Sequence, residues 1–377
     1  MTTPQPPDIE PDGEPRGDPR PRWWLELLAL SALGVAQPLF DLLARHPTFL
    51  VAHHVGAGRL LVFTGLVYLG PPLALGALEA LAWSRRPALA ERLHLGARFA
   101  LAALLVLPPL YRTGMGSAAA LALAAGLAGL ATLALTRSTV ARTFVTLLAL
   151  LSPVVPVVFL ARPPAADILR PASVPVHRVQ IGNPVPVVLV ILDELPLISL
   201  LGPSRQIDAD LYPNFAALAA RSHWYRNATT VAPLTDLAVP AILTGRRPRD
   251  VAPTAAEHPD SLFTLLGGSY EMRVIESQTR VCPASLCGGE DPARDASGRL
   301  GLLVADAAVA WAHLVAPREL RARLPSISVA WGGFLGGGRP TGAGAREGEG
   351  SASDEVKMHI WAADRRRDFD RFLDSLE

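Results

Sequence analysis

The distribution of apolar residues divides the chain into two parts. Between Trp23 and Leu160 they form long runs, whereas from Arg162 onward they fall in short runs separated by Pro, Gly, Asp and Arg. A helix needs roughly 20 apolar residues to cross a hydrocarbon core about 30 Å thick, because its backbone polar groups must be satisfied internally. Five segments meet this requirement, of which the third is short and contains proline: Trp23–Ala44, Arg59–Trp83, Leu95–Tyr111, Gly116–Thr136 and Ala141–Ala161. The pattern predicts a membrane domain over 23–161 with about five transmembrane helices.

Arginines predict how these helices are oriented. One set of loops is rich in arginine, with Arg20, Arg22, Arg85, Arg86, Arg92, Arg137 and Arg142; the opposite set holds Arg45, Arg59 and Arg112. Loops rich in Lys and Arg stay in the cytoplasm. The N-terminus is therefore expected in the cytoplasm, and an odd number of spans places the residues after Arg162 outside. We expect a multi-pass protein of a bacterial-type plasma (inner) membrane, with the lipid bilayer as a partner.

The remaining segments differ in composition. Residues 1–22 are rich in Pro, Asp, Glu and Arg and predict a disordered cytoplasmic tail, without the pattern of a cleavable signal peptide. A linker is expected over 162–184. We expect the first part of an α/β domain over 185–331, a Gly-rich loop over 332–353 and an amphipathic helix over 354–377.

Overall composition narrows the classes of function. Half of the residues, 50%, are hydrophobic, and the mean hydropathy is +0.28. The formal net charge is only +1, so no strong positive field favours a nucleic acid as a partner. The sequence predicts no nucleic-acid binding.

Both cysteines, Cys282 and Cys287, lie in the part expected outside the cytoplasm. An oxidising compartment favours a disulfide between two such neighbours. A zinc site would need two more Cys or His ligands at suitable spacing, which the surrounding sequence lacks. We predict a small disulfide-closed loop.

The soluble part begins with a continuous apolar run from Pro186 that ends in Asp193 and Glu194. Such a run is typical of a buried parallel strand, and α/β sheets place ligands at the carboxyl ends of their strands. An amphipathic helix follows, Tyr212–Arg221, with Pro213 near its start. After it come a strand-like segment, His223–Thr230, and an apolar segment that opens at Thr235 and closes in Leu-Thr-Gly-Arg.

This order of motifs, from about Val187 to Pro248, resembles the sulfatase branch of the alkaline phosphatase superfamily. The sulfatase nucleophile is a Cys or Ser, converted to formylglycine, in a Cys/Ser-x-Pro-x-Arg motif. Thr235 stands at the corresponding position, and Leu237 and Val239 replace the Pro and Arg. The segment Thr235-Asp-Leu-Ala-Val-Pro is similar to that of membrane-anchored phosphoethanolamine transferases, which use an unmodified threonine and have a five-span membrane domain.

The resemblance implies a mostly parallel sheet and a divalent metal cation (Ca, Zn or Mn) held by Asp193, Glu194 and Thr235. It also implies that Thr235 is the nucleophile towards an anionic or lipid-linked ester. A metal-bound hydroxyl has a lowered pKa, and a helix N-terminus attracts anions. Thr235 has an alternative role as a helix N-cap, with Asp236 complementing the helix dipole. Arg246 is a weaker candidate for substrate binding.

The second group of metal ligands that such enzymes carry downstream is missing; His359 and Asp364 stand in a helical context that does not match it. Two functions are therefore expected. One is a metal-dependent hydrolase or transferase of sulfate or phosphate (phosphoethanolamine-type) esters in the cell envelope, either as a truncated form or as one that recruits its missing half from a partner chain. The alternative is an inactive membrane protein that uses the half-domain for binding.

Overall fold

The computed structural model describes residues 20–171, 173–193, 195–276, 278–287, 296–327 and 334–336. The chain divides into two compact units, which are described separately. The first comprises Met1–Leu169 with Ala293–Asp364, and the second comprises Arg170–Pro292 with Arg365–Glu377. Of the tail predicted over 1–22, residues 1–19 lie outside the described residues. The helix predicted over 354–377 and almost all of the Gly-rich loop over 332–353 also lie outside them.

Five helical segments of the first unit are long and apolar enough to cross a membrane, as predicted. The first span consists of α1 (Arg20–Ser31), the π-helical η1 (Ala32–Ala36) and α2 (Gln37–Arg45). The second, third and fourth spans are single helices: α4 (Ala57–Arg85), α5 (Pro87–Arg112) and α6 (Ser117–Arg137). The fifth span consists of α7 (Thr139–Leu151) and α8 (Val154–Leu160). The third span is longer than the sequence predicts, because α5 starts at Pro87 and continues through Pro108 and Pro109. Neighbouring helices in a bundle compensate for the backbone bonds that such prolines remove.

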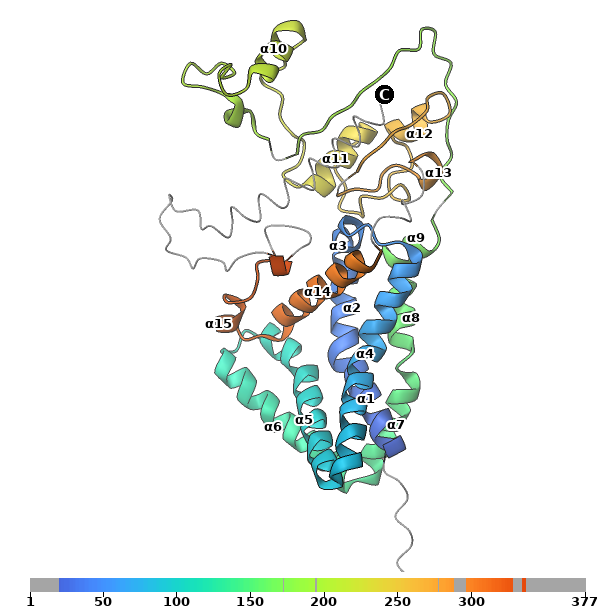
Figure 1. The fold of residues 1–377 in the computed structure, drawn as a ribbon, viewed down its shortest axis with the longest axis vertical. Coiled ribbons are helices and arrows are strands. Elements are labelled where there is room, and N and C mark those ends of the chain that lie inside the picture. Colours follow the sequence, from blue (N-terminus) through green and yellow to red (C-terminus); the bar gives the residue numbers. More distant parts are fainter. Residues whose placement is uncertain are drawn as a thin grey trace, which may run out of the picture. The chain divides into compact units, whose positions relative to one another are not determined.

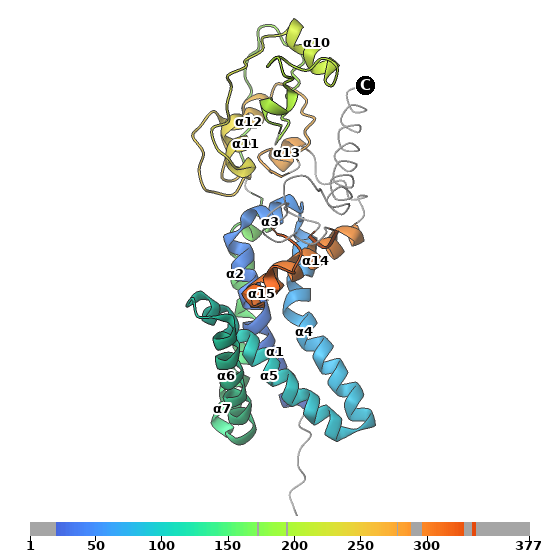
Figure 2. The same cartoon turned by 90° about the vertical axis from the view of Figure 1, so that its left-hand side faces the viewer.

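The spans pack as a helical bundle (Figures 1 and 2). Helix α1 packs against α4, α5 and α7, and α5 packs against α6. The short helix α3 (Pro47–Ala52) packs against α2, and the short helix α9 (Ala165–Leu169) packs against α4 and α8. Aromatic rings fill the core between α2 and α8, where Phe40 and Phe159 stack at 4.4 Å between ring centroids.

A helix from late in the chain completes this core. Helix α14 (Ala296–Val315) packs against α2 and α4, followed by α15 (Arg318–Arg321) and η3 (Phe334–Gly336). Asp306 of α14 is fully buried. Its carboxylate accepts hydrogen bonds from the backbone N–H of Phe334 (2.8 Å) and from Nε2 of His53, the residue that ends α3 (2.9 Å). Order along the chain predicts that α14 belongs to the soluble domain; in the structure it packs against the membrane helices instead.

The second unit is built from short helices and turns. Its helices are η2 (Leu197–Leu200), α10 (Pro213–Arg221), α11 (Thr235–Thr244), α12 (Leu262–Leu266) and α13 (Ala284–Cys287). Helix α10 forms as predicted, with Pro213 as its first residue. The end of the predicted linker is bound into this unit, because the N–H of His177 donates to the carbonyl of Thr264 (2.8 Å) and the carbonyl of His177 accepts from the N–H of Gly268 (3.2 Å).

The predicted strands over 186–192 and 223–230 are not formed. The described part of the chain contains no strand, only two isolated bridges, Leu201 with Ile207 and Thr254 with Arg280. A strand exists only when a neighbour accepts and donates its backbone hydrogen bonds, and no described segment pairs with residues 186–192. Their side chains are accordingly exposed, Val188 by 59%. The alkaline-phosphatase-like sheet is therefore not shown.

Candidate functional site

Thr235 and Asp193 come together in the second unit. The hydroxyl Oγ1 of Thr235 donates a hydrogen bond of 2.7 Å to Oδ2 of Asp193, 42 positions earlier in the sequence. Thr235 is the first residue of α11, and the N-cap is Leu234, which makes no side-chain cap. The alternative N-cap role of Thr235 is therefore wrong, since its hydroxyl faces the carboxylate instead of the backbone of its own helix. Asp236 does lie in the first turn, where a negative charge complements the helix dipole.

Local sequence explains where α11 begins and ends. The helix buries Pro240, Ala241 and Leu243 on one side and packs against α12, whose Ser261 and Thr264 form a reciprocal capping box. It ends at Gly245, which has φ 65°, a left-handed conformation that glycine adopts without a Cβ penalty. The buried face of α11, its contact with α12 and its end at Gly245 thus fix the position of the helix, whose first turn carries Thr235.

The charge environment of the site is set by acids. Partial burial is the main cause that raises the pKa of Asp236, and the neighbouring carboxylate of Asp250 raises it further. Asp193 is exposed, at the end of the extended segment 186–192. Two carboxylates thus flank Thr235, one exposed and bound to its hydroxyl and one half-buried on the helix. An anionic substrate needs positive groups in addition to the backbone N–H groups of α11.

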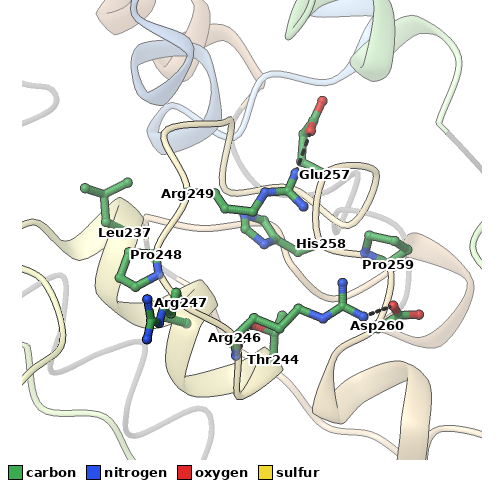
Figure 3. Close-up of a pocket in the computed structure, with 11 residues that line it drawn as sticks. Leu237, Thr244, Arg246, Arg247, Pro248, Arg249, Glu257, His258, Pro259 and Asp260 are labelled. Atoms are coloured by element: carbon green, nitrogen blue, oxygen red, sulfur yellow. Dashed lines mark hydrogen bonds and ion pairs between the residues drawn. The ribbon is translucent and has the colours of Figure 1, made fainter.

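Arg246 lies at the other end of α11, in a shallow pocket (Figure 3). A helix of this length separates it from Thr235 by roughly 15 Å along the axis. Its guanidinium binds Asp260 at 2.6 Å, and Arg249 binds Glu257 at 3.5 Å. Figure 3 shows His258 between these two pairs. The structure therefore places Arg246 in an ion pair and not beside Thr235.

His258 was not singled out from the sequence. Its side chain is 9% exposed, and Nε2 has no hydrogen-bond partner among the described residues. Burial, and secondarily the charge of Arg249, lowers its pKa, so the ring is neutral at pH 7. The sequence around His258, between Glu257 and Pro259, gives no signal that its ring is buried.

The cysteines form the disulfide that the sequence predicts, Cys282 to Cys287. Glu276 organises the turn before it, and sequence reasoning missed this residue. Its carboxylate accepts hydrogen bonds from Val281 N–H and Cys282 N–H, both 2.9 Å, and from the hydroxyl of Thr279 at 2.7 Å. A carboxylate bound in this way fixes the start of the disulfide loop.

The predicted metal site can be tested against the donors in place. Asp193 and Thr235 offer hard oxygen atoms, which suit Ca²⁺ and Mn²⁺ better than softer ligands do. Glu194 lies outside the described residues, and among those described no group of three His, Cys, Asp or Glu side chains is arranged to hold a metal ion. The described oxygens fit one edge of a metal site and do not complete it.

Comparison with known proteins gives no match. No family model fits the chain, and neither a curated protein nor a solved structure is similar to it.

Proposed function

We propose that this protein is a membrane-anchored, sulfatase-like hydrolase or transferase of sulfate or phosphate (phosphoethanolamine-type) esters, with Thr235 as its nucleophile. The observation that carries the proposal is the 2.7 Å hydrogen bond between Thr235 Oγ1 and Asp193 Oδ2. A hydroxyl is a weak nucleophile until an adjacent base takes its proton. The order of motifs around Thr235 and the five apolar helices support the same assignment.

The chemistry assigns one role to each residue. Thr235 Oγ1 attacks the phosphorus or sulfur atom while Asp193 takes the hydroxyl proton, and the bond from that atom to the ester oxygen breaks. The leaving alkoxide takes a proton from solvent. The backbone N–H groups of the first turn of α11 stabilise the negative charge on the transferred group. Water or an acceptor hydroxyl then attacks the threonine ester and restores Thr235.

A divalent cation would assist by polarising the ester oxygens. Asp193, Glu194 and Thr235 are the residues of this chain that would hold it. Because the described donors do not complete a metal site, the proposal includes further ligands from a partner chain. The exposed apolar segment 186–192 supports such a partner, since it presents unpaired backbone and apolar side chains.

The proposed nucleophile can be tested with the full chain in detergent, supplied with Mn²⁺, Ca²⁺ or Zn²⁺ and with nitrophenyl phosphate, phosphodiester or sulfate. We expect Thr235→Ala to abolish turnover and Asp193→Asn to lower it by about 10² to 10⁴-fold. Mass spectrometry should find the transferred group on Thr235. Thr244→Ala is a matched control at the other end of α11, and Asp210→Asn is an exposed acid of the same unit. Full turnover in Thr235→Ala would remove the threonine mechanism.

The proposed location places the N-terminus in the cytoplasm and the second unit outside. A cysteine introduced into 173–179 should react with a membrane-impermeant reagent in intact cells, whereas one in 84–95 should not. The native cysteines are joined to each other and do not interfere. The reverse labelling pattern would overturn the orientation.

The second candidate is a binding module without turnover. It is favoured by the absence of a complete three-ligand group among the described residues. It predicts that no ester is turned over even when a partner chain is supplied, while the exposed segment 186–192 becomes protected from hydrogen exchange on binding that partner.

A further inference from the structure

Helix α15 lies beside the turn that joins α5 to α6, although the two are far apart in the sequence. The backbone N–H of Arg318 donates to Oγ of Ser117, 201 positions earlier (3.4 Å), and the guanidinium of Arg321 lies over the ring of Tyr111, 5.2 Å from its centroid. Figure 1 shows α15 next to this turn. The contacts bring four arginines to one part of the surface, which we call the arginine cluster: Arg112, Arg318, Arg321 and Arg323.

The arginine cluster carries a surplus of positive charge. Among the described residues, the ion pairs of arginine involve other positions: Arg45, Arg98, Arg246, Arg249 and Arg273. The acid of α15 is Glu319, which is fully exposed. Its pKa is lowered first by a hydrogen bond from its own backbone N–H and then by one from the hydroxyl of Ser117, whereas the charge of Arg318 contributes less. One carboxylate engaged in this way does not balance four guanidinium ions.

The guanidinium groups are available to a ligand. Arg112, Arg318 and Arg323 are exposed, and Arg321 is partly buried against Tyr111. Only Nε of Arg321 is used within the chain, where it donates to the carbonyl of Ala316 (2.8 Å), so both terminal nitrogens remain for another acceptor. Arginine binds phosphate oxygens through two parallel N–H groups, and this geometry uses these terminal nitrogens.

The cluster lies at the level of lipid headgroups. The third apolar span ends at Arg112 and the fourth begins at Ser117, so the short turn between them stands at a membrane surface. Tyr111 is placed at the end of its span, where amphipathic rings favour the interface. The third and fifth spans end on the same side, because each reverses the direction of the one before it. The cluster therefore faces the surface from which the chain leaves for the second unit.

Apolar side chains next to the arginines favour a lipid over a soluble anion. Leu320, between Arg318 and Arg321 in the sequence of α15, is 46% exposed, and Leu121 at the start of α6 is 42% exposed. In water these side chains would add exposed apolar surface, whereas at a bilayer surface they meet acyl chains. Guanidinium groups beside exposed leucines match a molecule that has an anionic headgroup and an apolar body.

We propose that the arginine cluster binds an anionic phospholipid, whose phosphate lies among the guanidinium groups of α15 and whose acyl chains run along Leu320 and the start of α6. In the orientation proposed above, this lipid belongs to the outer leaflet. It fastens α15 to the bilayer surface. The site is separate from Thr235 and does not rest on the proposed turnover.

The test uses the full chain in nanodiscs of phosphatidylcholine alone or of phosphatidylcholine mixed with phosphatidylglycerol of the same acyl chains. Hydrogen exchange of residues 316–324, followed by mass spectrometry, reports on α15 itself. We expect phosphatidylglycerol to slow this exchange about tenfold. Arg318→Gln/Arg323→Gln should abolish the slowing, whereas Arg318→Lys/Arg323→Lys keeps the charge and should keep most of it. Both positions are exposed, so the substitutions leave the packing of the bundle intact.

Arg85→Gln/Arg86→Gln is the matched control, because it removes two exposed arginines from the turn after the second span, at the opposite membrane surface. It should preserve the slowing at 316–324. Equal exchange of the wild-type chain in the two kinds of nanodisc would overturn the proposal, as would unchanged slowing in Arg318→Gln/Arg323→Gln. Complete reversal of the slowing by millimolar glycerol phosphate would assign the cluster to a soluble anion and overturn the lipid assignment. None of these results bears on turnover at Thr235.

Discussion

The two units stabilise their polar groups in opposite ways. In the first unit the backbone hydrogen bonds lie mainly within helices, and side chains such as His94 and Arg98 pair with acids across helices. In the second unit the hydrogen bonds are those of turns, caps and one disulfide loop, and an apolar segment remains exposed. A helix forms its hydrogen bonds locally, whereas a strand depends on a neighbour. A chain can therefore complete a helical bundle while a segment without a pairing neighbour, such as residues 186–192, forms no strand.

The largest expected effect is in the first unit. Arg98→Met leaves Glu26 buried and without its main counter-charge, and should cost about 3–5 kcal/mol of unfolding free energy. Thermal or denaturant unfolding of the full chain in detergent would measure it. Arg92→Met, on an exposed face of the same helix, should change little. The double variant Glu26→Gln/Arg98→Met should recover much of the loss, and its failure to do so would show that packing, not charge, dominates.

Next comes the disulfide of the second unit. Replacing Cys282 and Cys287 together by serine removes a constraint on the unfolded chain worth about 2 kcal/mol for so short a loop. Hydrogen exchange of residues 278–287, followed by mass spectrometry, should become faster. Ser285→Ala in the same loop serves as the control. Unchanged exchange in the double variant would mean that Glu276 alone holds the loop.

The third effect is a pH dependence confined to the second unit. The pKa of His258 is lowered below its ordinary value of 6.5 by burial and by Arg249, so the unfolded state binds a proton more readily. The neutral ring of His258 therefore contributes to the stability of the folded state above pH 6.5, and this contribution is lost as the pH falls through the lower pKa that the ring has in the folded state. Hydrogen exchange around α11 and α12 should therefore accelerate below pH 6.5. His258→Asn should remove this dependence, whereas His223→Gln, at an exposed position, should preserve it.

A smaller effect is expected at the end of α11. Gly245→Ala places a Cβ in a left-handed conformation and should cost about 1 kcal/mol, seen as faster exchange of the last turn of α11. Gly182→Ala, at a glycine without a positive φ, is the control. Equal effects of the two substitutions would argue against the helix-end geometry.

The smallest effect concerns the exposed segment. Val188→Asp should change the unfolding free energy by less than about 0.5 kcal/mol, because the side chain is exposed in this chain. Val281→Asp, at a fully buried position, should be severely destabilising by comparison. A large loss in Val188→Asp would show that residues 186–192 are covered in the protein as isolated.

The sequence allowed much of the first unit to be predicted, because a span depends on a run of about 20 residues that can be read locally. It did not reveal that α14 belongs to this unit, since the partners of Asp306, such as His53, lie far away along the chain. The pairing of ionisable side chains inside the bundle was missed for the same reason, because Glu26, Glu79 and His94 stand in separate spans.

The candidate site was predicted unevenly. The meeting of Asp193 with Thr235 followed from motif order, and the structure brings the two together. The sheet that was expected to position them is not shown, because pairing of strands depends on segments distant in sequence. Arg246, the weaker candidate for substrate binding, lies at the other end of α11 in an ion pair with Asp260, a partner that the sequence pattern did not indicate.

The burial of Asp306 has a topological consequence for the whole chain. Because α14 is fastened to the membrane helices, residues 170–287 form an insertion whose two ends both return to the same unit. A segment attached at both ends explores a smaller volume than one attached at a single end, and the entropy lost grows only slowly with its length. Membrane anchoring of Thr235 is thus a double tether, which would survive a single proteolytic cut within the segment.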